Sequence, residues 1–550
     1  MKKKYLAVIL VISMLGSLSA CGNEGNQEQE STPQDTQVKE STENYVPEAD
    51  SWETPYAETV TLHTVTSEHS SAVYPEGDDI TKNEWIRQYL ERFNIEVVTD
   101  WVSDEYDTKI NLAFANNEIP DVFRVTASQL QQLVEADMLY DMTEVWDKYA
   151  SDTVKGFMES DPDTFETGMF DGKLYGISQM HYGFIDQPDF IWLRKDWMEE
   201  QNLKAPETIE DLENICLKFM EAYGGYGMAV DKSLDYLNIL AVAWHAYPDM
   251  WIETSDGSIG YGSVQPEMKE ALATWAKWYE NGILAADFPN YDFGAMNEAV
   301  VSGKVGVQPF YQWWGYNPGG DMVSSQGPEA YFEPYKIPSA DGKQVMQSIF
   351  FANSPYIVVS KNCKNPEAVL KLIDFKAYIQ NDSFGTSDEE LRNLLMLNDI
   401  GHVTGAFGIN PPMADANAFD LVYEAMKTGD TTKLNDSNSL SKYNNSMEWI
   451  NNHTPGVLGE FLQQGNGDKA AYAIAREALN NDNFILSKLW GRAPDAQLSY
   501  GSSLDDLLTE GFTKIIIGAE PIDYFDTVVD NWSKAGGSEV TAQMNEMYGN

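Results

Sequence analysis

Cysteine, histidine and basic residues are scarce in this chain. Of its 550 residues, 3 are cysteine and 6 are histidine, and 36 basic residues face 86 acidic ones, for a formal charge of −50. With no Cys/His cluster, a catalytic zinc site lacks evident ligands, and no metal is expected. The charge excludes electrostatic capture of nucleic acid as a main role. It disfavours a polyanionic ligand only weakly, because a local cationic pocket could override the global field.

Long apolar runs are also lacking, apart from a short one near the N-terminus. Residues 5–15 follow three lysines and precede Leu18, Ser19, Ala20 and Cys21. A basic start, a short apolar core and small residues before a cleavage point are typical of an export signal, and the run is too short to span a bilayer. The cysteine adds a bacterial lipobox, which predicts that residues 1–20 are removed and that the Cys21 thiol is lipidated. An ordinary secretory signal with a chance cysteine is the alternative.

A polar segment follows the lipobox. Residues 22–50 contain eight acidic residues, one lysine and few sizeable apolar side chains. Such a composition cannot bury enough surface to offset the entropy of ordering, so residues 21–50 are predicted to be a flexible acidic linker. Beyond Cys21 only Cys216 and Cys363 remain. Two solitary thiols fit a reducing habitat better than a disulfide scaffold, although a Cys216–Cys363 bond stays open.

From Val60 onward, short β-like runs alternate with longer helical ones, which is typical of α/β lobes. The chain is longer than one core usually supports, so two or more lobes are expected. The pattern predicts strands at residues 61–66, 95–99 and 120–125, and helices at 82–93, 106–116, 208–219 and 365–375. Thr208 with Asp211, and Ser503 with Asp506, have the spacing of capping boxes. Six tryptophans lie on helical stripes and are predicted to be core residues: Trp85, Trp146, Trp197, Trp275, Trp278 and Trp532.

Several short stretches are spread in order along the chain. They are NEIPDV at 117–122, DGKLYGI at 171–177, FIWLRKDW at 190–197, APETIEDL at 205–212, VSGKVG at 301–306, FTKIIIG at 512–518 and FDTVVDNW at 525–532, followed by Gly536 and Gly537. Their order and spacing resemble the extracellular solute-binding lipoproteins of ABC importers (family 1), in the large branch of the maltodextrin-binding-like sugar receptors.

This resemblance implies an α/β fold with two lobes, a hinge and an interlobe ligand cleft, the type II periplasmic-binding-protein fold. The lobes would comprise residues 51–183 plus 349–400 and 184–348 plus 401–550, with hinge crossings near 182–188, 348–353 and 399–410. It further implies an oligosaccharide ligand, the transmembrane permease subunits of an ABC transporter as partners, no cofactor, and a lipid-anchored monomer on the extracellular face of a Gram-positive cell membrane. One departure concerns calcium. Residues 221–227 replace a calcium loop found in many large members and lack its oxygen ligands, so no calcium is expected there.

Aromatic side chains are the first candidates for sugar contacts, since flat rings suit the C–H patches of a pyranose. Trp313 and Trp314 stand in a loop-like segment, and in the resembled family a tryptophan near this place stacks on a sugar ring; Trp313 aligns best. Core packing is the alternative for both. The other candidates in this class are Tyr236, Trp244, His245 and Trp490.

Polar residues that follow predicted strands form a second class. Loops at the carboxyl ends of parallel strands are where α/β folds bind ligands. The candidates are Ser67, Glu68 and His69 after one strand, and Arg124, Thr126 and Ser128 after another.

Enzymatic function has little support. No Gly-x-Ser-x-Gly elbow, phosphate loop or His-Glu-x-x-His motif is present. With 86 acidic residues, a glycosidase-like carboxylate pair can be chosen anywhere and carries no weight. The sequence therefore predicts a non-catalytic oligosaccharide receptor. A receptor for a peptide or another solute, and a surface polysaccharide-degrading enzyme, remain the alternatives.

Overall fold

The computed structural model describes residues 52–67, 74–179, 189–350, 355–380, 395, 407–409, 411–434 and 437–549. The predicted signal peptide, the linker and Cys21 lie outside the described residues. So do most of the predicted hinge crossings. Among the described residues, no helix has the length and apolar character needed to cross a membrane. Cys216 and Cys363, for which the sequence left a disulfide bond open, are buried free thiols.

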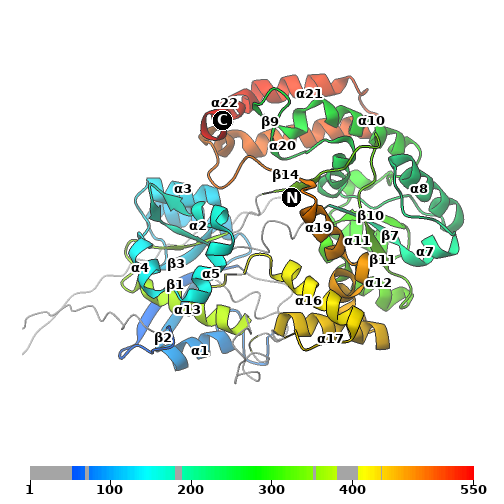
Figure 1. Cartoon of the computed structure of the whole chain (residues 1–550). Coiled ribbons are helices and arrows are strands. Elements are labelled where there is room, and N and C mark those ends of the chain that lie inside the picture. The colour runs from blue at the N-terminus through cyan, green and yellow to red at the C-terminus, as the bar shows by residue number, and fades with distance from the viewer. Residues whose placement is uncertain are drawn as a thin grey trace, which may run out of the picture. The chain divides into compact units, whose positions relative to one another are not determined.

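A five-stranded mixed sheet organises the first lobe (Figure 1). Its strand order is β2 (Ile95–Val102), β1 (Val60–Thr66), β3 (Val122–Val125), β13 (Tyr356–Val359) and β6 (Gly176–Ser178). Strand β1 runs parallel to β2 and β3, whereas β13 runs antiparallel to β3 and β6. The late strand β13 therefore returns the chain to a sheet that was begun about 300 residues earlier.

Helices cover this sheet and supply its core. They are α1 (Glu84–Phe93), α2 (Tyr106–Asn116), α3 (Ala127–Glu135), α4 (Thr143–Tyr149), α5 (Asp152–Ser160), α6 (Pro162–Glu166) and α13 (Pro366–Gln380), with the small ladder β4 (Met169–Phe170) and β5 (Lys173–Leu174). Trp85 of α1 is fully buried and meets Phe375 of α13 edge to face. Phe407 and Ile409 also pack in this core, so the described chain is still in the first lobe beyond residue 400.

The second lobe has its own sheet and core. Strand β7 (Phe190–Arg194) lies between β10 (Val307–Phe310) and β11 (Phe332–Tyr335), antiparallel to both, and β8 (Trp251–Glu253) pairs with β9 (Ile259–Tyr261). Its helices include α7 (Lys195–Glu200), α8 (Ile209–Tyr223), α9 (Asp235–Asn238), α10 (Pro266–Glu280), α11 (Phe293–Val301), α12 (Gly319–Gln326), α16 (Ala414–Thr428), α17 (Ser437–Asn452), α18 (Leu458–Glu460) and α19 (Ala471–Asn480). The predicted capping box of Thr208 and Asp211 opens α8 and is confirmed.

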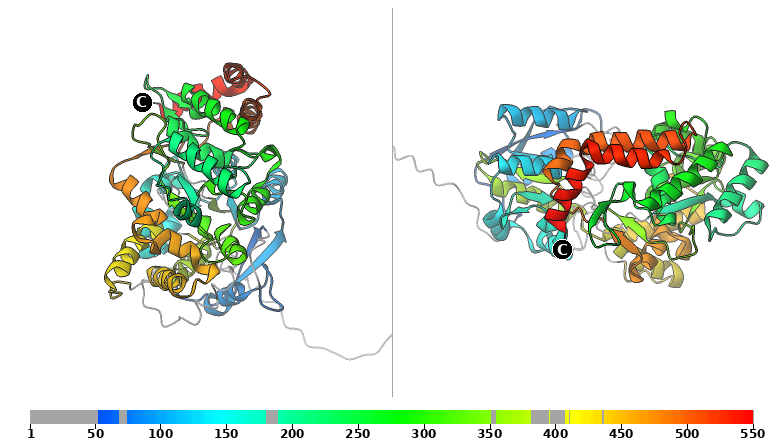
Figure 2. Two further views of the ribbon diagram at one scale, coloured as in Figure 1. Left: turned by 90° about the vertical axis from the view of Figure 1, so that its right-hand side faces the viewer. Right: turned by 90° about the horizontal axis from the view of Figure 1, so that it is seen from above.

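Three C-terminal helices complete this lobe: α20 (Asp495–Ile516), α21 (Tyr524–Trp532) and α22 (Ser538–Tyr548). Helix α20 packs against α10, α21 and α22 (Figure 2). The capping box predicted at Ser503 and Asp506 is wrong, because α20 begins eight residues earlier and runs through both. In mid-helix the Ser503 hydroxyl donates to the Tyr500 carbonyl at 2.8 Å. The six tryptophans predicted to be core residues are all buried.

A short parallel ladder and one buried carboxylate lie where the chain is predicted to cross between the lobes. Strand β12 (Gln347–Ile349) pairs with β14 (Phe484–Leu486). The Asp189 carboxylate accepts hydrogen bonds from the Ser348 backbone N–H at 2.9 Å and from its hydroxyl at 2.6 Å. Burial raises the pKa of Asp189 to about 7. Three distant parts of the chain are thus tied together at this point.

Candidate functional site

Residues 486–493 separate two cavities. Ser487, Leu489, Gly491 and Ala493 line one cavity, whereas Leu486, Trp490 and Arg492 line the other. We call residues 486–493 the partition segment. It contacts the first lobe closely, because a Cβ atom at Gly491 would lie only 2.8 Å from the Cβ of Thr167.

The first cavity, here named the interlobe cavity, has a volume of about 510 Å³. The first lobe contributes the N-terminus of α3, where Thr126 caps the helix in a capping box with Gln129. The second lobe, the residue that directly follows β12 and the partition segment contribute the remaining walls. They include Ser233, Asp235, Asn238, Asp249, Trp251, Tyr261, Phe350, Gln497, Asp505, Thr509 and Phe512.

Among the described residues of this lining, Phe350 is the aromatic side chain that is exposed. It directly follows β12 and is 44% exposed, whereas Trp251, Tyr261 and Phe512 line the same cavity but are largely buried. Tyr261 stacks on Trp532 with ring centroids 5.6 Å apart and an interplanar angle of 3°. A fixed wall with one free ring can offer a face to the C–H patch of a sugar.

A chain of hydrogen bonds fixes the polar side of the cavity. Asn238 donates to Asp249 Oδ2 at 3.0 Å, and the Ser263 hydroxyl donates to Asp249 Oδ1 at 3.2 Å. The Tyr261 hydroxyl lies 3.1 Å from Asp505 Oδ1 and 3.4 Å from Asp249 Oδ1, so it bridges the two carboxylates. Desolvation by the surrounding protein, followed by repulsion from Asp505, raises the pKa of Asp249 to about 6.

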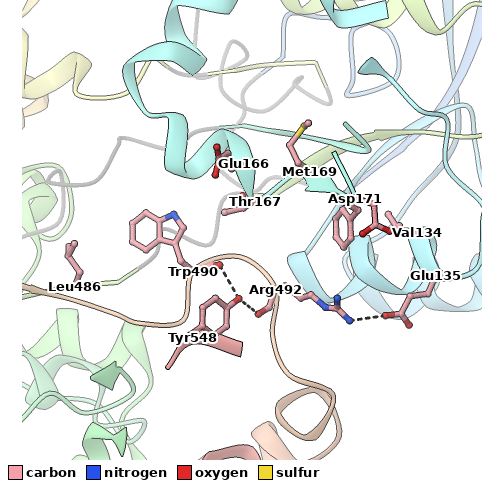
Figure 3. Close-up of a pocket in the computed structure, with 11 residues that line it drawn as sticks. Val134, Glu135, Glu166, Thr167, Met169, Asp171, Leu486, Trp490, Arg492 and Tyr548 are labelled. Carbon is pink, nitrogen blue, oxygen red and sulfur yellow. Dashed lines mark hydrogen bonds and ion pairs between the residues drawn. The ribbon is translucent and has the colours of Figure 1, made fainter. Parts of the chain in front are cut away.

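The second cavity, here named the outer cavity, has a volume of about 680 Å³. Figure 3 shows how Tyr548 of α22 holds the partition segment there: its hydroxyl lies 3.2 Å from the Trp490 carbonyl and 2.5 Å from the Arg492 carbonyl. Arg492 reaches Glu135 of α3 at 3.5 Å, an ion pair between the two lobes. Both partners are exposed, so this pair adds little stability.

The two adjacent tryptophans have different surroundings. Trp314 has no exposed surface, lies between the rings of Trp192 and Phe332, and donates from Nε1 to Gln308 at 2.7 Å. It is a core residue in this structure and presents no face to a ligand. Trp313 is partly buried and meets Phe310 edge to face at 4.4 Å. It does not line either cavity.

Tyr236 belongs to the same aromatic cluster as Trp313. Its ring stacks on Phe310 at 4.9 Å, and its neighbour Asp235 lines the interlobe cavity. Trp244 packs against Trp275 and Trp278 and is 8% exposed, which makes it a core residue here. His245 instead pairs with Asp341 at 3.2 Å, away from both cavities.

The polar candidates also divide. Thr126 and Ser128 line the interlobe cavity, as Trp490 lines the outer one. Ser67 follows β1 and Arg124 lies within β3, both partly exposed, but neither lines these cavities. Glu68 and His69 lie outside the described residues.

Sequence reasoning missed Phe350, Asp249 and Asp505. A single phenylalanine at a strand end and two of 86 acidic residues carry no distinguishing pattern. Only Asp249 left a faint signal, because Pro248–Asp249 is a turn-forming pair, and Asp249 indeed has a left-handed backbone with φ of 63°. Their assembly depends on contacts between segments more than 100 residues apart.

The family model for bacterial extracellular solute-binding proteins matches residues 77–376. The chain belongs to this family. The match covers more than half of the sequence and includes every strand of the two main sheets except β1. Two lobes built around separate sheets are the type II fold that the sequence predicts, and this fold class is confirmed.

Known relatives of this solute-binding protein match along most of its length. Lipoprotein LipO of Bacillus subtilis is 22% identical over 488 residues, covering 82% of this chain and 86% of that protein. The polygalacturonan/rhamnogalacturonan-binding protein YtcQ of Bacillus subtilis is 20% identical over 495 residues, covering 85% and 88%. An HMO-binding, ABC-transporter-associated solute-binding protein of Bifidobacterium longum infantis has the same fold, with a TM-score of 0.63, 16% identity and coverage of 89% and 98%.

Proposed function

We propose that this protein is the lipid-anchored receptor of an ABC importer, that it binds an oligosaccharide in the interlobe cavity, and that it delivers the sugar to a membrane permease as a monomer. The observation that carries the proposal is the cavity itself. The N-terminus of the first-lobe helix α3 and Phe350, which directly follows β12, line this cavity. It combines the exposed ring of Phe350 with fixed hydrogen-bonding groups. Sugar sites need this combination of apolar face and oriented polar atoms. Two of the relatives carry names that state glycan binding.

Binding is expected to stabilise the protein and to draw the lobes together. A ligand that binds only the native state adds roughly 2.7 kcal/mol at about a hundred times its dissociation constant, which raises the melting temperature. The mature chain is incubated with a panel of oligosaccharides and, as a separate arm, a peptide library. Melting is followed by fluorescence, compactness by small-angle X-ray scattering, and products by chromatography.

The outcomes separate the alternatives. A raised melting temperature and a smaller radius of gyration with an intact glycan support a sugar receptor. Responses to peptides alone would replace the sugar with a peptide, and release of shorter glycans would indicate an enzyme. No response to any glycan refutes the proposal.

The anchor is tested at Cys21. Because the thiol is the atom that takes the lipid, Cys21→Ala is expected to release the protein into the medium or leave it uncleaved. Membrane fractionation and mass spectrometry of the N-terminal peptide measure this. Cys216→Ala removes a buried thiol elsewhere and is the matched control, with no expected change in fractionation. The lipobox interpretation would be contradicted if Cys21→Ala stayed on the membrane like the wild type and the wild-type N-terminal peptide carried no acyl group.

A further inference from the structure

Three carboxylates face the interlobe cavity from the second lobe. Asp235 begins α9, Asp249 precedes β8, and Asp505 lies within α20; all three are exposed and line the cavity. Among the described residues that line it, none is lysine, arginine or histidine. The net charge of −50 left open a local cationic pocket that would override it. The described lining has the opposite sign.

Two of the three carboxylates, those of Asp249 and Asp505, are held in place by hydrogen bonds. Asp249 accepts from Asn238 and Ser263, and the Tyr261 hydroxyl bridges Asp249 and Asp505. Tyr261 is itself fixed by stacking on Trp532. The carboxylates of Asp249 and Asp505 therefore cannot easily turn away from an incoming ligand. Their remaining lone pairs can accept hydrogen bonds from its hydroxyl groups.

The same arrangement penalises a ligand of like charge. Besides desolvation, repulsion from Asp505 and Asp235 raises the pKa of Asp249, so the charges on this side of the cavity already oppose one another. A carboxylate on the ligand would add a further negative charge beside these three groups, and like charges at close range repel one another. Sugar hydroxyls, by contrast, are neutral donors that carboxylates bind well.

We propose that the interlobe cavity selects uncharged oligosaccharides and rejects uronate-containing ones, with Asp505, Asp249 and Asp235 acting as a charge filter. This inference rests on the proposed sugar-receptor function and adds the chemical class of the ligand. It separates this chain from its relative that is named for binding polygalacturonan, a polyuronate.

Matched glycans test the filter on the wild-type protein. The neutral probes are cello-, malto-, manno- and galacto-oligosaccharides. Each one that binds is compared by calorimetry with the same glycan oxidised at C6 to the carboxylate and with the same glycan carrying a C6 amine. The carboxylate is expected to bind about tenfold more weakly or worse. The amine should retain or exceed the affinity of the parent, because its charge is opposite while its size is similar.

Two results overturn the filter while leaving the receptor function intact. One is a carboxylate that binds as tightly as its neutral parent. The other is an equal loss for carboxylate and amine, since size rather than charge would then decide. If no glycan of any kind binds, the proposed function fails first, and the filter fails with it.

Asp505→Asn then assigns the effect to a residue. The amide can still accept from Tyr261, so the cavity wall should survive, and melting of the unliganded protein checks this. The penalty on the carboxylate probe is expected to shrink by about threefold or more, because one repelling charge is gone. Asp506→Asn is the matched control: it removes the same charge from the next position of α20, and Asp506 does not line the cavity. An equal effect of both variants, or no effect of Asp505→Asn and Asp235→Asn, excludes the filter.

Discussion

Trp314→Ala is expected to lower the free energy of unfolding by about 3–5 kcal/mol, the cost of cutting a buried tryptophan to a methyl group. The ring is fully buried between Trp192 and Phe332, and Gly319 packs closely on it. The substitution also leaves the Gln308 side-chain oxygen, inside the core, without its indole donor. Urea and thermal unfolding of the unliganded protein measure the loss.

Trp313→Ala is the matched control for this experiment, because the neighbouring ring is only partly buried. It removes the same number of atoms from the preceding position in the chain, and we expect it to lower the free energy of unfolding by clearly less. Equal losses of unfolding free energy for the two variants would mean that the Trp313 ring is a core element too. A smaller loss for Trp314→Ala would contradict the packing described here.

Phe350→Ala is expected to weaken glycan binding by roughly one to two decades, with little change in the melting of the unliganded protein. Stacking and burial of an aromatic ring on a sugar contribute about 1–3 kcal/mol, and about 1.4 kcal/mol corresponds to tenfold in affinity. The exposed fraction of 44% means that little core packing is lost when the ring is removed. Isothermal titration with a glycan identified in the panel measures the effect.

Phe350→Tyr keeps the flat face and is expected to retain most of the affinity. Trp313→Ala, titrated in parallel, tests the residue that the sequence favours. A loss of affinity at Trp313 with none at Phe350 would move the stacking site to the aromatic cluster of Tyr236, Phe310 and Trp313. Loss at neither position would contradict an aromatic contact from this part of the protein.

Local features of the fold were predictable because their signals are local. The Thr208–Asp211 box, the strand β1 and the buried tryptophans of α1 and α10 each follow from residue spacing over a few positions. All of them are confirmed. The box at Ser503 and Asp506 shows the limit of this reasoning. The same spacing occurs inside α20, where tertiary packing extends the helix past it.

The candidate site was less predictable because distant segments create it. No local pattern says which of Trp313 and Trp314 turns inward; that depends on Gln308, Trp192 and Phe332. That Thr126 and Ser128 line a cavity could be predicted, since α/β folds commonly bind ligands at the carboxyl ends of their parallel strands. The part of the cavity wall that the second lobe contributes could not be predicted, because α9, β9 and α20 come together only in the folded chain.

The partition segment places different constraints on substitution and on length. Alternate side chains of residues 486–493 serve different cavities, so evolution can change Leu489 for one cavity and Trp490 for the other almost independently. A single inserted or deleted residue would instead displace the side chains that follow it relative to both cavities. Both ends are held, by β14 pairing with β12 and by the Tyr548 hydroxyl. We therefore expect this segment to tolerate substitutions better than changes in its length.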